Sequence, residues 1–152
     1  MSRIEVKFEG NVTRLIIRGA FDESLKLPEE LKCKTVIIDM NEMTAFNSMG
    51  VRMWLNWTKS KKGFSEMRLE NCRPNFMKQA TFVKEIVPTY AQVDSFYVPY
   101  YEPDTQEQVD VKFTFGKEYD QTELRLPQPL HNGKELKLDV EDNYFGFIGK
   151  KR

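Results

Sequence analysis

The residues of this chain that are best suited to a chemical role form the turn Asn47-Ser48-Met49-Gly50, which opens an expected helix. A serine at a helix start meets unpaired backbone N–H groups and the positive end of the helix dipole. The Ser48 hydroxyl can cap the helix, which contributes about 1 kcal/mol. A phosphate on the same hydroxyl would be stabilised locally and would add roughly two negative charges to the surface. The two roles are compatible.

Catalytic motifs do not accompany this turn. The sequence has no glycine-rich nucleotide or phosphate loop, no GxSxG nucleophile turn and no set of metal ligands. Asp22 and Asp39 lie near the expected ends of strands, where clefts form in α/β proteins. Scattered acidic residues, however, are more often surface charges or loop caps. We therefore predict that the protein is not an enzyme and uses no cofactor.

Composition and charge indicate a folded protein that does not bind nucleic acid. The 152 residues include 11 Phe, 6 Tyr and 2 Trp, which is typical of a packed core. Lys+Arg and Asp+Glu both number 23, so the formal net charge is zero, and basic runs such as Lys150–Arg152 are short. A nucleic-acid surface would need a basic patch.

The cysteines and the apolar runs indicate the compartment. Cys33 and Cys72 have no second Cys or His at metal-ligand spacing, so we expect no metal site and a reducing environment. No stretch approaches the ~20 apolar residues of a membrane span, and the N-terminus has no uninterrupted apolar segment typical of a signal peptide. We expect a cytoplasmic protein without membrane insertion.

The pattern of apolar residues predicts an α/β domain over residues 1–101, with helices packed on a mixed sheet. Residues 23–31 carry only a weak helical pattern that Pro28 interrupts, so this element should be short or irregular. In chain order, the expected elements are strands at 3–9, 12–19 and 35–40, a helix from Ser48 that ends at Gly63, a strand at 67–71, a helix at 75–83 and a strand at 95–101.

The remaining residues, 102–152, predict a small β-rich extension with hairpins. Alternating strands are expected at 109–115, 123–126 and 135–140, and glycine and proline residues divide them. Aromatic residues of the preceding strand should pack between the domain and this extension, with Tyr97 and Tyr101 on one face and Phe96 and Tyr100 near the other.

Three segments in order resemble the STAS domain: Gly19-Ala20-Phe21-Asp22, the strand Val36–Met40, and Phe46–Val51 at the start of the main helix. That family includes bacterial anti-sigma factor antagonists, the cytosolic tails of sulfate transporters and small partners of lipid-transport ATPases. The resemblance covers roughly Arg3 to Tyr101. It implies a STAS-like mixed sheet and a module for protein interaction in signal transduction.

In the antagonists of this family, the turn usually reads Asp-Ser-Ser/Thr-Gly, and the anti-sigma kinase phosphorylates its first serine. The resemblance thus implies Ser48 as a phosphorylation site and an anti-sigma-type kinase or another regulatory ATPase as the partner. Asn47 replaces the acidic residue and Met49 the second hydroxyl residue, so constitutive docking stays open beside phospho-regulation. The candidate partner-binding residues are Asp22, Asn47, Ser48, Met49, Gly50 and Arg52.

Two alternative functions remain open at this stage. A small-ligand sensor for nucleotides or lipids, as in some STAS domains, would need a closed pocket beside Asp22 and Asn47. A structural subunit would instead form a homodimer through the extension.

The extension is similar to those of some bacterial STAS-like proteins that carry paired-cysteine knuckles. Here the corresponding turns, Glu102–Thr105 and Leu130–Gly133, contain no Cys. We interpret the extension as a zinc-ribbon-like hairpin set without zinc, in which His131 is a lone turn histidine.

Two tryptophans on the main helix allow two interpretations. Trp54 and Trp57 are three residues apart, so they lean toward one side of the helix and could form an exposed aromatic docking site. The favoured interpretation places Trp54 in the core and Trp57 half-covered by the extension.

Overall fold

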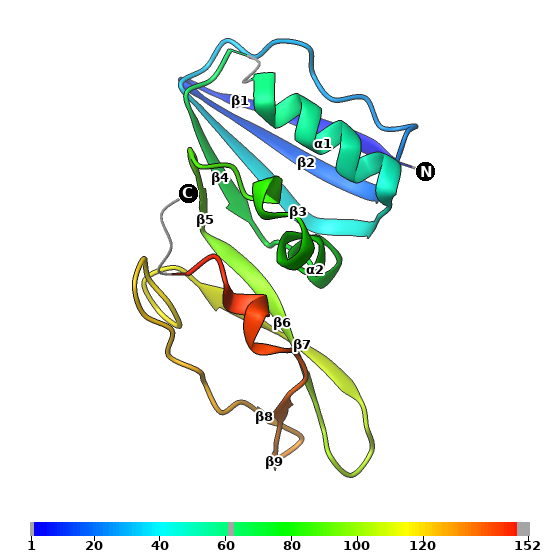
Figure 1. Ribbon diagram of the computed structural model, residues 1–152, viewed down its shortest axis with the longest axis vertical. Helices are drawn as coiled ribbons and strands as arrows, with labels where there is room; N and C mark the ends of the chain where they lie inside the picture. The colour runs from blue at the N-terminus through cyan, green and yellow to red at the C-terminus, as the bar shows by residue number, and fades with distance from the viewer. Residues whose placement is uncertain (1, 61–62, 149–152) are drawn as a thin grey trace.

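The computed structural model describes residues 2–60 and 63–148 (Figure 1), so the basic run Lys150–Arg152 lies outside the described residues. The larger of its sheets has five strands in the order β1-β2-β3-β4-β5. β1 and β2 pair antiparallel, and the other neighbours are parallel. Its strands are β1 (Arg3–Glu9), β2 (Val12–Phe21), β3 (Thr35–Phe46), β4 (Glu66–Glu70) and β5 (Ala91–Val93).

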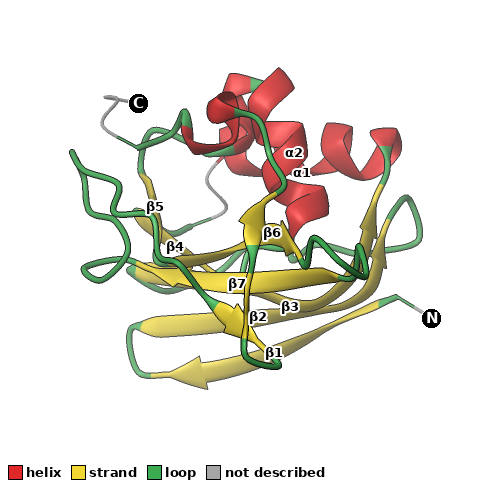
Figure 2. Ribbon diagram, turned by 90° about the horizontal axis from the view of Figure 1, so that it is seen from below, coloured by secondary structure: helices red, strands yellow, loops and turns green. Residues whose placement is uncertain are grey.

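Two helices lie on the same face of this sheet (Figure 2). They are α1 (Ser48–Ser60), between β3 and β4, and α2 (Pro74–Phe82), between β4 and β5. α2 begins at Pro74, whose fixed φ suits the first helical position. A short 3₁₀ helix, η1 (Lys84–Ile86), follows α2. The predicted α/β class with helices on a multi-stranded sheet is therefore confirmed at this level.

The segment between β2 and β3 is irregular, as Pro28 indicated. No helix forms between Phe21 and Thr35 in the described chain. The segment nevertheless packs closely, because Leu25 and Leu31 are buried in the core. At Gly63 the backbone takes a φ of 99° and passes so near Leu31 that a Cβ would lie 2.1 Å from the Leu31 carbonyl oxygen. Glycine at this position therefore serves both the turn and the close approach.

β3 is longer than predicted and runs to Phe46 rather than ending at Met40. The expected loop after Met40 continues as strand because β2 is long enough to pair with it. Register shifts between Ile16 and Arg18 and between Gly19 and Ala20 give β3 extra residues relative to β2. A strand is predicted from the alternation of buried and exposed residues, and the bulges interrupt this alternation. The predicted end of β3 is therefore too early.

A three-stranded sheet in the order β10-β6-β7 forms the second part of the molecule. Its strands are β6 (Ser95–Tyr101), β7 (Gln108–Thr114) and β10 (Lys137–Leu138). We expected β6 to continue the first sheet, but the last strand there is β5, which ends at Val93. Asp94 alone separates the two strands, and its backbone N–H donates to the Leu69 carbonyl at 2.8 Å. The chain therefore changes sheets at this residue.

The extension contains less strand than its sequence pattern predicts. Residues 123–126 form only an isolated bridge at Leu124, and the strand expected over 135–140 is divided between β9 and β10. The closing aromatic segment is a 3₁₀ helix. The remaining elements are β8 (Leu130–His131), β9 (Lys134–Glu135) and η2 (Asp142–Phe145).

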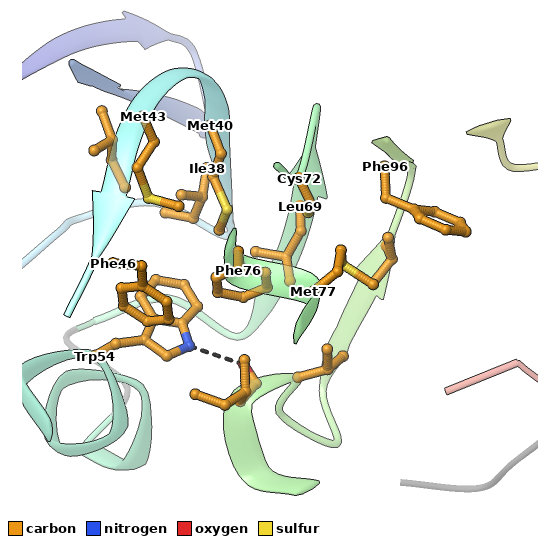
Figure 3. Packing of buried hydrophobic residues seen from close by; sticks show 14 of the residues in the cluster. Ile38, Met40, Met43, Phe46, Trp54, Leu69, Cys72, Phe76, Met77 and Phe96 are labelled. Atoms are coloured by element: carbon orange, nitrogen blue, oxygen red, sulfur yellow. Dashed lines mark hydrogen bonds between the residues drawn. The ribbon is translucent and has the colours of Figure 1, made fainter. Parts of the chain in front are cut away.

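One continuous hydrophobic cluster joins the two parts of the molecule. In Figure 3 it extends from Phe46 and Trp54 through Phe76 and Met77 to Phe96 on β6. Phe96 in turn has its ring near those of Tyr144 and Phe145 in the extension. As alternation predicted, Phe96 and Tyr100 are buried, whereas Tyr97 and Tyr101 are half-buried.

No helix in the described part of the chain combines the length and the apolar character that crossing a membrane requires.

Candidate docking site at the start of helix α1

Asn47 caps α1. Its side-chain oxygen Oδ1 accepts the backbone N–H of Gly50 at 2.8 Å, and its carbonyl accepts the N–H of Val51 at 2.9 Å. These bonds are typical of an N-cap residue and satisfy N–H groups that the first turn would otherwise leave unpaired. Ser48 is the first helical residue. The interpretation of Ser48 as the cap is therefore wrong, because the side-chain oxygen of Asn47 already accepts the N–H of Gly50.

Gly50 brings the helix against the end of β2. A Cβ at this position would lie 2.0 Å from the Phe21 carbonyl oxygen and 2.8 Å from its carbonyl carbon. Both atoms belong to backbone, which cannot move aside as a side chain would. The helix can therefore approach this close only with glycine at the position.

Ser48, Met49 and Arg52 are exposed at this end of α1. Met49 keeps 43% of its surface accessible, which is high for a large apolar side chain. The Ser48 hydroxyl has no hydrogen-bond partner, and Arg52 no ion pair, within residues 2–60 and 63–148. Arg52 follows Ser48 by four residues, so both side chains lie on the same side of the helix. The result is a small surface with a hydroxyl, an apolar side chain and a cation.

Asp22 lies beside this surface. Phe21 pairs with Phe46 in the parallel register of β2 and β3, so Asp22 and Asn47 leave adjacent strands at the same edge of the sheet. Asp22 Oδ1 accepts the hydroxyl of Ser24 at 2.5 Å and its backbone N–H at 2.9 Å. These two hydrogen bonds lower the pKa of the Asp22 carboxyl. The carboxylate thus shapes the turn that follows β2 and adds a negative charge next to the helix start.

Asp39, the other acid expected near a strand end, lies elsewhere. Because β3 continues to Phe46, Asp39 sits within the strand. Its Oδ1 accepts the side-chain N–H of Asn71 at 3.0 Å, and its Oδ2 lies 4.0 Å from Arg14, which also pairs with Glu70 at 2.5 Å. Asp39 therefore belongs to a polar cluster across β2, β3 and β4, and it does not meet Asp22.

Phe21 and Phe46 belong to segments that carry the resemblance, but sequence analysis did not predict them as residues of this site. Phe21 supplies the backbone that α1 contacts, and its ring meets those of Phe46 and Trp54 at centroid distances of 5.2 and 6.2 Å. The signal was present, because each phenylalanine directly precedes a polar residue of the site. It was not used, since aromatic residues before a loop occur at many strand ends.

The tryptophans of α1 are both in the core. Trp54 is fully buried and its Nε1 donates to the Ile86 carbonyl at 2.8 Å (Figure 3). Trp57 is 5% exposed, and its Nε1 donates to the Pro28 carbonyl at 2.7 Å. An exposed aromatic docking site is thus contradicted. The expected cover of Trp57 is also corrected, because the segment after β2, not the extension, supplies it.

The cysteines offer no reactive group at the helix start. Cys72 is fully buried and bridges to Phe96 of β6, and desolvation raises the pKa of its thiol, so that it stays protonated. Cys33 is half-buried in the irregular segment before β3.

The two turns of the extension that correspond to cysteine knuckles do come together. Lys134 places its ammonium 2.8 Å from Asp104 and 3.8 Å from Glu102, while His131 lies 3.2 Å from Glu107. The Glu102 carboxylate also accepts the backbone N–H of Thr105 at 2.6 Å. Ion pairs therefore join the turns. Among the residues that the structure describes, no group of His, Cys, Asp and Glu side chains has the arrangement of a metal site.

Two surface hollows lie away from the Asp22 and Asn47 turn. One lies between α2 and the extension and includes Phe82, Leu138 and Tyr144. The other lies beside α1, where Leu27, Pro28, Met53 and Trp57 form its apolar part. Neither is lined by Asp22 or Asn47, the residues beside which a ligand-sensing function predicted a closed pocket.

Searches with the sequence and with the fold gave no relatives: no protein-family model, curated protein or solved structure matches this chain.

Proposed function

We propose that the chain is a non-catalytic docking module of the STAS type, which binds a partner protein through the start of α1 and is regulated by phosphorylation of Ser48. The observation that carries this proposal is the exposed Ser48 hydroxyl beside a cap made by another residue, Asn47. Because the cap does not use this hydroxyl, a kinase can modify Ser48 without removing the hydrogen bond that begins the helix.

The arrangement of the elements supports the STAS type. An antiparallel strand pair leads into parallel strands, and helices pack on this mixed sheet, which is the arrangement that the resemblance implied. The residues that carry the resemblance also meet in space. Gly50 contacts the backbone of Phe21, and Phe21 is paired with Phe46. The contact between Gly50 and Phe21 therefore explains why the helix-opening segment has a glycine at this position.

The electrostatics of the helix start support a phosphate-controlled surface. A phosphate on Ser48 would lie at the positive end of the α1 dipole, and Arg52 one turn further offers a cation to it. The same phosphate would add roughly two negative charges beside the apolar Met49 and the carboxylate of Asp22. A partner that contacts Met49 in the unmodified protein would then meet a negatively charged surface instead of an apolar one.

The partner that this proposal favours is an anti-sigma-type kinase or another regulatory ATPase in the cytoplasm. Such a partner would both contact the start of α1 and phosphorylate Ser48. The chain itself needs only a kinase-accessible hydroxyl and a surface that binds.

Affinity capture with three versions of the chain tests this function. Wild type and Ser48→Asp are compared with Thr89→Asp, which adds the same charge at another exposed hydroxyl. Thr89 precedes β5, and since β3 and β5 run parallel it lies at the end of the sheet opposite Ser48. We expect wild type and Thr89→Asp to recover the same kinase or ATPase, and Ser48→Asp to lose it.

Other outcomes separate the parts of the proposal. Equal recovery by all three versions would indicate constitutive docking and count against the phospho-switch. Absence of any specific partner from wild type would contradict the docking function itself. The small-ligand sensor and the homodimer through the extension remain predictions.

A further inference from the structure

We infer that β1 is a self-recognition edge, through which two copies of this chain join their five-stranded sheets across a two-fold axis at Val6. β1 is the outermost strand of the sheet (Figure 2), and β2 is its only paired neighbour among the described residues. An open strand of this length is a template for pairing with another strand. The partner is a second copy because the residues of β1 complement themselves.

The apolar residues of β1 share one face. Ile4, Val6 and Phe8 lie opposite Ile17, Leu15 and Thr13, so they belong to the face that packs on the helices. The side chains on that face are less covered at the edge of the sheet: Val6 is 38% and Phe8 77% exposed, whereas Leu15 on β2 is fully buried. A neighbouring strand would extend this apolar layer and cover both side chains.

The backbone of β1 is oriented for such a neighbour. In an antiparallel ladder, alternate residues direct both backbone groups to the same neighbouring strand. Gly10 and Asn11 form a two-residue turn with a positive φ at Gly10, so Glu9 and Val12 close the hairpin as a hydrogen-bonded pair. Every second residue back from Glu9 therefore bonds to β2, and the residues between them, Ile4, Val6 and Phe8, direct N–H and C=O toward the free edge.

The charges of β1 select one register. With Val6 opposite Val6 of the second copy, Ile4 faces Phe8, Glu5 faces Lys7 and Arg3 faces Glu9. Every charged residue then meets the opposite charge, and every apolar residue meets an apolar one. Cross-strand pairs of opposite charge stabilise a sheet, and like charges directly opposite destabilise it. Within its own chain Glu5 also contacts Lys7 and Arg18, at 3.5 and 2.9 Å, which keeps these groups on the same face.

Other registers lack this complementarity. A shift by two residues toward one end places Glu5 opposite Glu5 and Arg3 opposite Lys7. The opposite shift places Lys7 opposite Lys7 and Glu5 opposite Glu9. A shift by one residue sets apolar residues against charged ones, and parallel in-register pairing sets each charge against itself. Charged residues on an edge strand usually prevent pairing, but here they permit one antiparallel arrangement.

The paired sheets leave the proposed docking site open. β1 pairs antiparallel with its copy, so the two copies of Ser48 lie toward opposite ends of the joined sheet. Both α1 helices stay on the same face, because the apolar side of β1 continues across the axis. The dimer therefore presents two separate helix starts. This inference rests on β1 alone, so it holds or fails independently of the proposed function.

Charge reversal with light scattering tests the inference. Wild type should reach twice the mass of the 17.9 kDa chain as its concentration is raised. Lys7→Glu sets a new carboxylate against Glu5 of the second copy, and Glu5→Lys sets a new ammonium group against Lys7, so each single variant should stay at the monomer mass. An equimolar mixture of the two should regain the dimer mass, because each like-charged strand then meets its complement. The double variant in one chain should also dimerise.

Lys112→Glu serves as the control. Lys112 is exposed on β7, the outer strand of the second sheet, so its reversal should leave the dimer intact. Far-UV circular dichroism checks that every variant is folded. A wild type that remains at the monomer mass would overturn the inference. Single variants that dimerise like wild type would also overturn it, as would a mixture of the two folded variants that stays monomeric. The same holds if Lys112→Glu loses the dimer while the Glu5 and Lys7 variants keep it.

Discussion

The side-chain oxygen of Asn47 accepts the backbone N–H of Gly50 at 2.8 Å, so that a residue outside the helix fixes the start of α1. The consequence concerns Ser48, the residue after the cap. Ser48 lies within the capped turn, yet its hydroxyl contributes no hydrogen bond to that turn among the described residues. The cap and the proposed regulatory role thus fall on neighbouring side chains, and they can be separated by mutation.

Asn47→Ala should lower the free energy of unfolding by about 1 kcal/mol, since the Gly50 N–H loses its partner. Ser48→Ala should change it by less than about 0.5 kcal/mol, the range of an ordinary surface substitution. Urea denaturation of both variants beside wild type makes the measurement. If Ser48→Ala proved the more costly, the cap would have to be assigned to Ser48.

Gly50→Ala tests the close approach of α1 to β2. Helix propensity alone would make alanine about 1 kcal/mol more favourable than glycine within a helix. The new Cβ would meet the Phe21 carbonyl oxygen at 2.0 Å, and such overpacking typically costs about 1–3 kcal/mol. We therefore expect net destabilisation in the thermal midpoint, whereas a gain in stability would show that the helix is free to shift outward.

The two tryptophans of α1 should respond differently to the loss of their N–H groups. Trp54→Phe leaves the carbonyl of the fully buried Ile86 unpaired, which costs about 1–3 kcal/mol in addition to lost packing. Trp57→Phe frees the Pro28 carbonyl, which is only half-buried, so water can replace the donor. Chemical denaturation should rank Trp54→Phe as the more damaging change, and equal effects would be inconsistent with the burial of Ile86.

Asp120 should give the extension a dependence on acidic pH. Its carboxylate accepts the backbone N–H groups of Thr122 and Glu123, both at 2.9 Å, which lowers the pKa of Asp120 to about 2. Because the folded pKa is lower than the ordinary value of 3.8, this contribution to stability is present above about pH 4 and is lost as pH falls toward about 2.

The Asp120 carboxyl resonance, followed by nuclear magnetic resonance during an acid titration, measures this pKa directly. The free energy of unfolding of wild type and of Asp120→Asn should also be compared. The difference between them in favour of wild type should shrink as the pH falls from about 4 toward about 2. An Asp120 carboxyl that titrates near the ordinary value of 3.8 would contradict the hydrogen bonds from Thr122 and Glu123.

The sequence was sufficient for those parts of the fold in which one local pattern dominates. β1 alternates strictly, and α1 has helical spacing, so both were predicted nearly to their ends. β3 was predicted too short because bulges against β2 interrupt its alternation after Asp39. The switch of sheets at Asp94 was not predictable, since an alternating strand such as β6 fits either sheet, and one of its two partners, β10, lies far along the chain.

For the candidate site, sequence analysis named Ser48, Met49 and Arg52, which are exposed at the start of α1, but it assigned the helix cap to Ser48 instead of Asn47. Ser, Asn and Asp are all good caps, so residue type alone could not decide between Asn47 and Ser48. The requirement for glycine at position 50 depends on the Phe21 backbone, which is distant in sequence. Both assignments needed the distances between elements.

The central claim, that partners dock at the start of α1 under control of Ser48, is tested most directly by photo-crosslinking in cells. A photoreactive amino acid replaces Met49 in one version and Thr89 in another, and each is also made with Ser48→Asp. We predict a specific protein crosslink from position 49 that Ser48→Asp abolishes, and none from position 89. Crosslinks from position 89 alone, or from position 49 with equal yield in the Ser48→Asp background, would contradict the account.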